Sequence, residues 1–136
     1  MAALTAPRNT PMRHGDIEAH PVKAATTVHQ GSLVVLDAGF AAPGRTATGL
    51  IAAGRAEHSA TAVAAGDAMI EVRRGTFKFA NSADADEITQ ADAGADCYVV
   101  DDQTMAKTDA TETRSRAGRV MAVEADGVWV QVGIGL

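Results

Sequence analysis

The sequence predicts an all-β fold, a small barrel or sandwich of about seven or eight short strands. Short runs rich in valine and isoleucine alternate with glycine-containing turns, which recur roughly every eight to twelve residues. No segment has the sustained period of about 3.6 residues that marks a long amphipathic helix. Near the end of the chain an Asp-Gly pair separates two alternating apolar runs, which is typical of a β-hairpin. One short helical turn and an extended N-terminal arm complete the predicted fold.

The composition indicates one domain with a thin core. The chain has 136 residues, and soluble domains typically hold about 100 to 200. Its hydrophobic share is 46%, but much of this is alanine, and the aromatic residues are three phenylalanines, one tyrosine and one tryptophan. Because alanine buries little area, added stability from a partner or from self-association is favoured.

The charge balance disfavours nucleic acid as a partner. The chain carries 12 basic and 17 acidic residues, whereas phosphate binding needs clustered lysine and arginine. The nearest basic cluster, Arg114, Arg116 and Arg119, lies among acidic loops and is expected to be a solvated face. No apolar run approaches the roughly 18 residues of a membrane span, and the N-terminus lacks the apolar core of a signal peptide. We therefore expect a soluble protein with no membrane partner, made where thiols stay reduced.

The chain divides into an arm and a body. Residues 1–30 contain three prolines, charges of both signs and no sustained period, so they are expected to form an extended arm. Residues 31–136 are expected to form the β-rich domain. An arm of this kind can order on a partner, by adding a strand to a sheet edge or by lying in a groove, and the alternative is a frayed terminus. The groups suited to such contacts are apolar or basic: Leu4, Pro7, Arg8, Met12 and Arg13.

Several strands are expected in the body. Residues 32–37 form a β-branched run between turns, and residues 97–100 indicate a fully buried strand. Residues 48–57 are rich in alanine, but two interior glycines disfavour a helix and favour a strand. Gly66 and Asp67 indicate a turn.

A change of phase follows this turn. Ile70 and Val72 share one face of an alternating strand, whereas Phe77 and Phe79 are out of step with them by one residue. Gly75 lies between the two pairs. A glycine at a change of phase predicts a β-bulge, which would return both phenylalanines to the same core face.

Residues 88–94 have the pattern of a single helical turn. Thr89 can cap it, Asp92 stands three residues further on, and Gly94 can end it. Such a turn would connect strands across one end of a barrel or sandwich.

The C-terminal hairpin is the strongest local prediction. Asp126 and Gly127 separate two alternating runs, and a primed turn with positive φ is expected there. The second strand is expected to turn three residues towards the core: Val128, Val130 and Val132. Trp129 would then point outwards, either covered by a neighbouring strand or as part of a contact surface.

The sequence carries no catalytic or cofactor-binding signature. No nucleophile motif or phosphate-binding loop is present, and Asp84, Asp86 and Glu87 lack the pattern of a calcium loop. Cys97 is the only cysteine and is expected to be a buried apolar residue. The four histidines have no metal-ligand spacing: His14, His20, His29 and His58. We therefore expect a structural binding module that is not an enzyme and has no metal or cofactor.

Much of the body resembles the small decoration, or cement, proteins that coat tailed-bacteriophage capsids. The resemblance extends over roughly residues 31–133 and involves turns and strand cores, with no catalytic signature. Its segments are residues 64–79, 88–102, 106–108, 114–120 and 126–130.

The resemblance implies a structural virion protein that binds the outer surface of the capsid and stabilises the lattice of the major capsid protein. It implies a protein made in the bacterial host cytoplasm and then located on the virion. Proteins of this family commonly bind as trimers and some as dimers, so a homotrimer is favoured.

Two other functions stay open on the sequence. A phage tail or baseplate component would also be small, β-rich and oligomeric. A small ligand-binding β-barrel is the other alternative, with acidic residues near Asp101 and Asp102 lining its pocket.

Overall fold

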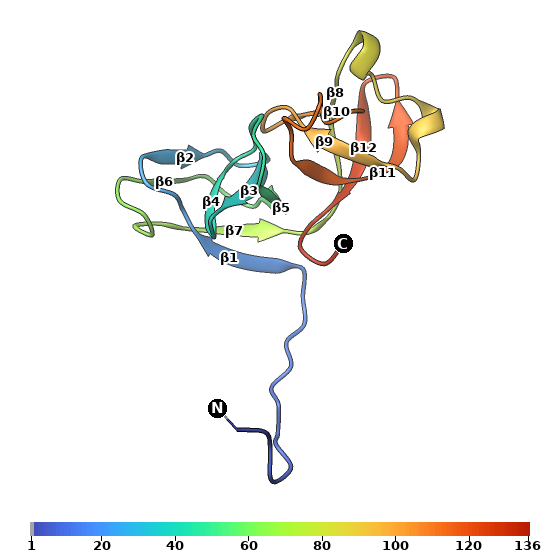
Figure 1. Ribbon diagram of the computed structural model, residues 1–136. Coiled ribbons are helices and arrows are strands. Elements are labelled where there is room, and N and C mark those ends of the chain that lie inside the picture. Colours follow the sequence, from blue (N-terminus) through green and yellow to red (C-terminus); the bar gives the residue numbers. More distant parts are fainter. Residues whose placement is uncertain (1) are drawn as a thin grey trace.

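The computed structural model describes residues 2–136 and contains two β-rich lobes side by side, with an arm that projects away from them (Figure 1). The first lobe holds β1 (Ile17–Pro21), β2 (Thr26–Val28), β3 (Leu33–Asp37), β4 (Phe40–Pro43), β5 (Ile51–Ala56), β6 (Ala60–Ala62) and β7 (Met69–Arg73). The second lobe holds β8 (Gly75–Asn81), β9 (Asp96–Val99), β10 (Thr104–Ala106), β11 (Arg116–Glu124) and β12 (Gly127–Val132). Two single turns of 3₁₀-helix, η1 (Asp84–Asp86) and η2 (Gln90–Asp92), lie between β8 and β9.

The all-β prediction is confirmed, and the second lobe is a closed barrel. Its strands follow the order β10-β8-β12-β11-β9. The first lobe contains a five-stranded sheet, β1-β7-β5-β3-β4, and a separate pair, β2-β6. The described residues form twelve strands in place of the predicted seven or eight. The predicted number of strands was too low because three-residue strands such as β2 and β6 are too short to show a periodic pattern in the sequence.

Strand β3 lies between two hydrophobic cores. Leu33 and Val35 pack into the core of the barrel lobe, whereas Val34 and Leu36 pack into the core of the first lobe. Because both faces of the strand are buried, its sequence is a continuous apolar run without alternation. The strands predicted at residues 32–37, 48–57 and 97–100 are present as β3, β5 and β9. The strand β9 is not fully buried as predicted, because only Cys97 and Val99 of its residues are buried.

The predicted arm is too long. Residues 17–30 belong to the folded body, because β1 pairs with β7 and β2 pairs with β6. Val22 and Val28 are fully buried. Pro21 was interpreted as a sign of irregular chain, but a proline is compatible with an edge strand, and β1 is at the edge of its sheet. Only residues 2–16 extend away from the body, and Met1 lies outside the described residues.

The predicted bulge at Gly75 is wrong. β7 belongs to the sheet of the first lobe and β8 to the barrel, so the chain crosses between lobes at this point. Ile70 and Val72 contribute to one core and Phe79 to the other, with Phe77 packed against it. At this crossing the inward-facing positions change by one residue, which in the sequence has the same appearance as a bulge.

The turn at Gly66 and Asp67 is confirmed. The Asp67 carboxylate accepts a hydrogen bond from the Ala64 N–H at 2.7 Å, and the Gly66 N–H donates to the Val22 carbonyl at 2.9 Å. Gly66 has a φ of +83°, which favours glycine.

The helical turn predicted at residues 88–94 is confirmed as η2. Thr89 and Asp92 form its capping box, and the Thr89 N–H donates to the Asp92 carboxylate at 2.8 Å. The first turn, η1, has no counterpart in the sequence predictions.

The C-terminal hairpin is confirmed, but its turn differs from the prediction. Glu124 pairs with Gly127, so Ala125 and Asp126 form the turn, and Gly127 is not among the residues with positive φ. The Asp126 carboxylate accepts a hydrogen bond from Lys78 at 2.8 Å, which ties the turn to β8. This hydrogen bond and the lysine charge lower the pKa of Asp126 below its ordinary value.

Gly127 is required for close packing. A Cβ at this position would lie 2.8 Å from the Phe79 carbonyl oxygen and 2.9 Å from the Lys78 Cγ. The start of β12 therefore lies so close to the neighbouring strand β8 that a side chain at this position would clash.

We expect Gly127→Val to destabilise the protein by about 2 to 3 kcal/mol, because the new side chain overlaps the backbone of β8. Thermal unfolding followed by circular dichroism checks this. Ala125→Val is the matched control, since Ala125 is exposed in the same turn. Equal melting temperatures for the two variants would contradict the steric explanation.

The second strand of the hairpin faces the core as predicted. Val128, Val130 and Val132 are fully buried. Trp129 points outwards and is partly covered. Its Nε1–H donates to the Glu124 carboxylate at 2.7 Å, and the Lys78 ammonium lies 6.0 Å from the centroid of its ring.

Candidate functional site

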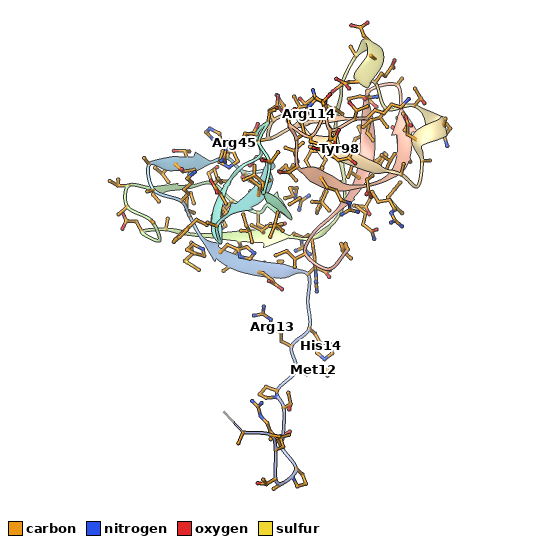
Figure 2. The ribbon with its side chains drawn as sticks, viewed as in Figure 1. Met12, Arg13, His14, Arg45, Tyr98 and Arg114 are labelled. Carbon is orange, nitrogen blue, oxygen red and sulfur yellow. The ribbon has the colours of Figure 1, made fainter. Side chains whose placement is uncertain are left out.

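The candidate site is the arm, residues 2–16, which leaves the body as an extended chain with no regular structure (Figure 1). All five predicted contact residues lie in it and are exposed: Leu4, Pro7, Arg8, Met12 and Arg13. Leu4 is 72% exposed and Met12 is 79% exposed. Figure 2 shows Met12, Arg13 and His14 on the part of the arm that leads away from the body. The arm therefore presents apolar surface that the body does not cover.

The root of the arm is held by Arg74, the residue at which the chain crosses between the lobes. The Arg74 N–H donates to the Asp16 carbonyl at 2.9 Å, and its Nη2 donates to the Gly15 carbonyl at 3.1 Å. Its Nη1 donates to the Ile134 carbonyl at 3.1 Å. One guanidinium thus joins the root of the arm to the C-terminal tail, so the arm leaves the body at a defined point.

Beyond this root the arm makes one polar side-chain contact with the body. Arg13 lies 3.3 Å from the Glu18 carboxylate, and the arginine side chain is 81% exposed. An ion pair this exposed contributes little to stability, because water screens it and both side chains lose rotamer freedom. The arm is therefore free to exchange this contact for one with a partner.

A shallow recess lies beside the root of the arm. It has a volume of about 280 Å³ and is bounded on one side by β5 and on the other by the C-terminal tail. The exposed apolar side chains at its edge are Ile51, Ile134 and Leu136. Arg116 at its rim is paired with Asp96 at 2.9 Å. The recess lies close to the root of the arm, because Arg74 donates hydrogen bonds both to Ile134 at the edge of the recess and to Gly15 at the root.

Acidic side chains outside the arm mainly support loops. Asp86 accepts hydrogen bonds from Thr108 at 2.7 Å and from Arg114 at 3.3 Å, and these contacts lower its pKa below the ordinary value. Asp101 accepts hydrogen bonds from the backbone N–H groups of Gln103 and Thr104. These carboxylates stabilise turns and do not converge on a common point.

The cysteine and histidine side chains show no sign of a catalytic or metal site. Cys97 is buried, and this burial raises the pKa of its thiol to about 12. The His58 Nε2 accepts a hydrogen bond from the Glu71 N–H at 3.2 Å. Within residues 2–136, no three histidine, cysteine or acidic side chains gather as metal ligands would. In the same part of the chain, no helix is long and apolar enough to cross a bilayer.

Sequence reasoning found the arm but missed Arg74 and the recess. Arg74 contacts residues 59 and 60 positions away, so no local pattern connects it to Gly15 or Ile134. Its position between two strand patterns, directly before Gly75, was the only local signal.

The fold and this site define a class: a two-lobed all-β protein with an exposed N-terminal arm. No family model, curated protein or solved structure matches this chain. The resemblance to capsid decoration proteins therefore stays a prediction.

Proposed function

We propose that this protein is a structural virion protein that binds the outer surface of a phage capsid and stabilises the lattice of the major capsid protein. The observation that carries this proposal is the arm, an extended segment with apolar and basic side chains that stay exposed, although Arg13 is paired with Glu18 of the body. We propose that the arm contacts the capsid and that the body rests on it as a platform.

The chemistry of the arm supports attachment to another protein. Leucine and methionine side chains each contribute about 1.5 to 3 kcal/mol when they pass from full exposure to full burial. Because Leu4 and Met12 are mostly exposed, most of this free energy can still be gained when they are buried against a partner. Ordering the arm offsets part of the gain. A modest net affinity is sufficient where several linked subunits bind one lattice, because each further contact is then intramolecular.

We further propose that the protein acts as a homotrimer, with a dimer as the alternative. The family resemblance favours a trimer. Exposed apolar residues outside the arm leave surface for such self-association: Ile51, Val63, Met69 and Met121. The proposed location is the virion, after synthesis in the cytoplasm of the bacterial host.

The alternatives are less well supported. A tail or baseplate component would use the arm in the same way, so a comparison of partners must separate the two functions. A small ligand-binding barrel is disfavoured because side chains fill the barrel lobe. Val99, Met105 and Val128 from three different strands are fully buried in its core.

A reconstitution experiment tests the proposal. Purified full-length protein is incubated with expanded capsid shells that lack it, and occupancy is measured after sedimentation. We expect saturable binding and a higher melting temperature of the shells.

Tail tubes and baseplates from the same phage form the parallel sample. Failure to bind shells or to raise their melting temperature would exclude capsid cementing. Binding to tails in preference to shells would support the tail alternative.

A further inference from the structure

The charges of this chain are divided unevenly between arm and body. Of its 12 basic residues, Arg8 and Arg13 lie in the arm. Of its 17 acidic residues, Asp16 lies at the root of the arm and the other 16 lie in the body. Residues 2–15 therefore carry positive charge only, while the body has a large excess of negative charge. Arg8 has no ion-pair partner among residues 2–136, and the pairing of Arg13 with Glu18 is highly exposed.

Each arginine of the arm follows an apolar residue. The pairs are Pro7-Arg8 and Met12-Arg13, five residues apart. Prolines at positions 7 and 11 favour an extended backbone, in which five residues span about 16 Å. The Arg74 contacts hold the chain at Gly15, so the second pair stays close to the body and the first reaches further out.

We infer that the arm recognises an acidic protein surface with two apolar recesses, each beside a carboxylate, about 16 Å apart. This inference rests on the proposed function and names the chemistry of the capsid surface that the arm would bind. The apolar residue of each pair fills a recess, and the adjacent guanidinium pairs with the carboxylate. Positive charge on the arm also steers it to its site, which the negative body alone would not approach.

The inference predicts association that depends on salt. The association rate of the full-length protein with immobilised shells is measured in NaCl of about 0.1 M and about 1 M, where the screening length falls from about 10 Å to about 3 Å. We expect the rate to fall about tenfold, because charge steering acts mainly on association. Arg8→Gln and Arg13→Gln should each reduce this dependence, and the double variant should lose most of it.

Two neutral substitutions are the matched controls. Leu4→Ser and Met12→Ser should speed dissociation and leave the salt dependence unchanged, since they remove apolar contacts and no charge. Insertion of two glycines between Asn9 and Thr10 should weaken binding several-fold, because it alters the spacing of the pairs. The same insertion between Ala2 and Ala3 should have little effect.

Three results would overturn the inference. In the first, shells bind at a rate that salt or the double arginine variant does not change, which leaves the proposed function intact. In the second, the two insertions have equal effects, which rejects the paired spacing. In the third, the unmodified protein binds duplex DNA as tightly as it binds shells. A failure to bind shells at all would reject the proposed function together with the inference.

Discussion

Deletion of residues 2–14 is expected to leave the body folded and to abolish stable attachment to capsid shells. The deleted segment contributes no buried residue and loses only the exposed pairing of Arg13 with Glu18. Gly15 and Asp16 are kept because their carbonyls accept hydrogen bonds from Arg74. A longer deletion, to residue 20, would remove most of β1 and unfold an edge of the sheet.

Two measurements check this prediction. Circular dichroism should give a melting temperature close to that of the full chain, and sedimentation with shells should show occupancy near background. The control keeps the length of the arm and replaces its five contact residues with serine: Leu4, Pro7, Arg8, Met12 and Arg13. If the deleted protein occupies shells as the full chain does, the arm is a frayed terminus.

Gly118→Ala should produce a large loss of stability for the addition of a single methyl group. A Cβ at this position would meet the carbonyl oxygen of Gln131 well inside van der Waals contact, and the carbonyl carbon at 3.0 Å. Gly118 is buried in β11 and lies at a shift in register between β11 and β9. Neither obstacle is a flexible side chain, so the barrel must distort to admit one methyl group.

We expect a loss of about 3 kcal/mol, which corresponds to a fall in melting temperature of about 10 °C. Thermal and urea unfolding check this value. Gly94→Ala is the control, because a Cβ there has no neighbour within 4 Å, although its φ of +90° disfavours alanine. A smaller loss for Gly118→Ala than for this control would contradict the close approach of β11 and β12.

Local patterns predicted the elements whose partners are close in sequence. The C-terminal hairpin was found because both strands and the turn lie within residues 116–132. The capping box of η2 was found because Thr89 and Asp92 are three residues apart. In each case the interacting groups belong to one short stretch of chain, so residue type and spacing carry the information.

Features that depend on distant segments were missed or misread. The strand β1 was assigned to the arm because its strand partner, β7, is distant in the sequence. β1 ends at Pro21, and β7 begins 48 residues later, at Met69. The role of Gly127 was attributed to positive φ, whereas the structure assigns it to the approach of Phe79. The sequence alone does not show which backbone segment will pack against a given glycine.

The sequence by itself determined the all-β class, the short strands, the hairpin and the presence of an exposed, basic and apolar N-terminal segment. Hydrophobic alternation and turn chemistry are local properties, and they are sufficient for these features. Only the tertiary structure decided that the chain divides into two lobes at Arg74, where the same side chain also anchors the arm to the C-terminal tail. These decisions depend on contacts between residues about 60 positions apart, which no local pattern of residue types specifies.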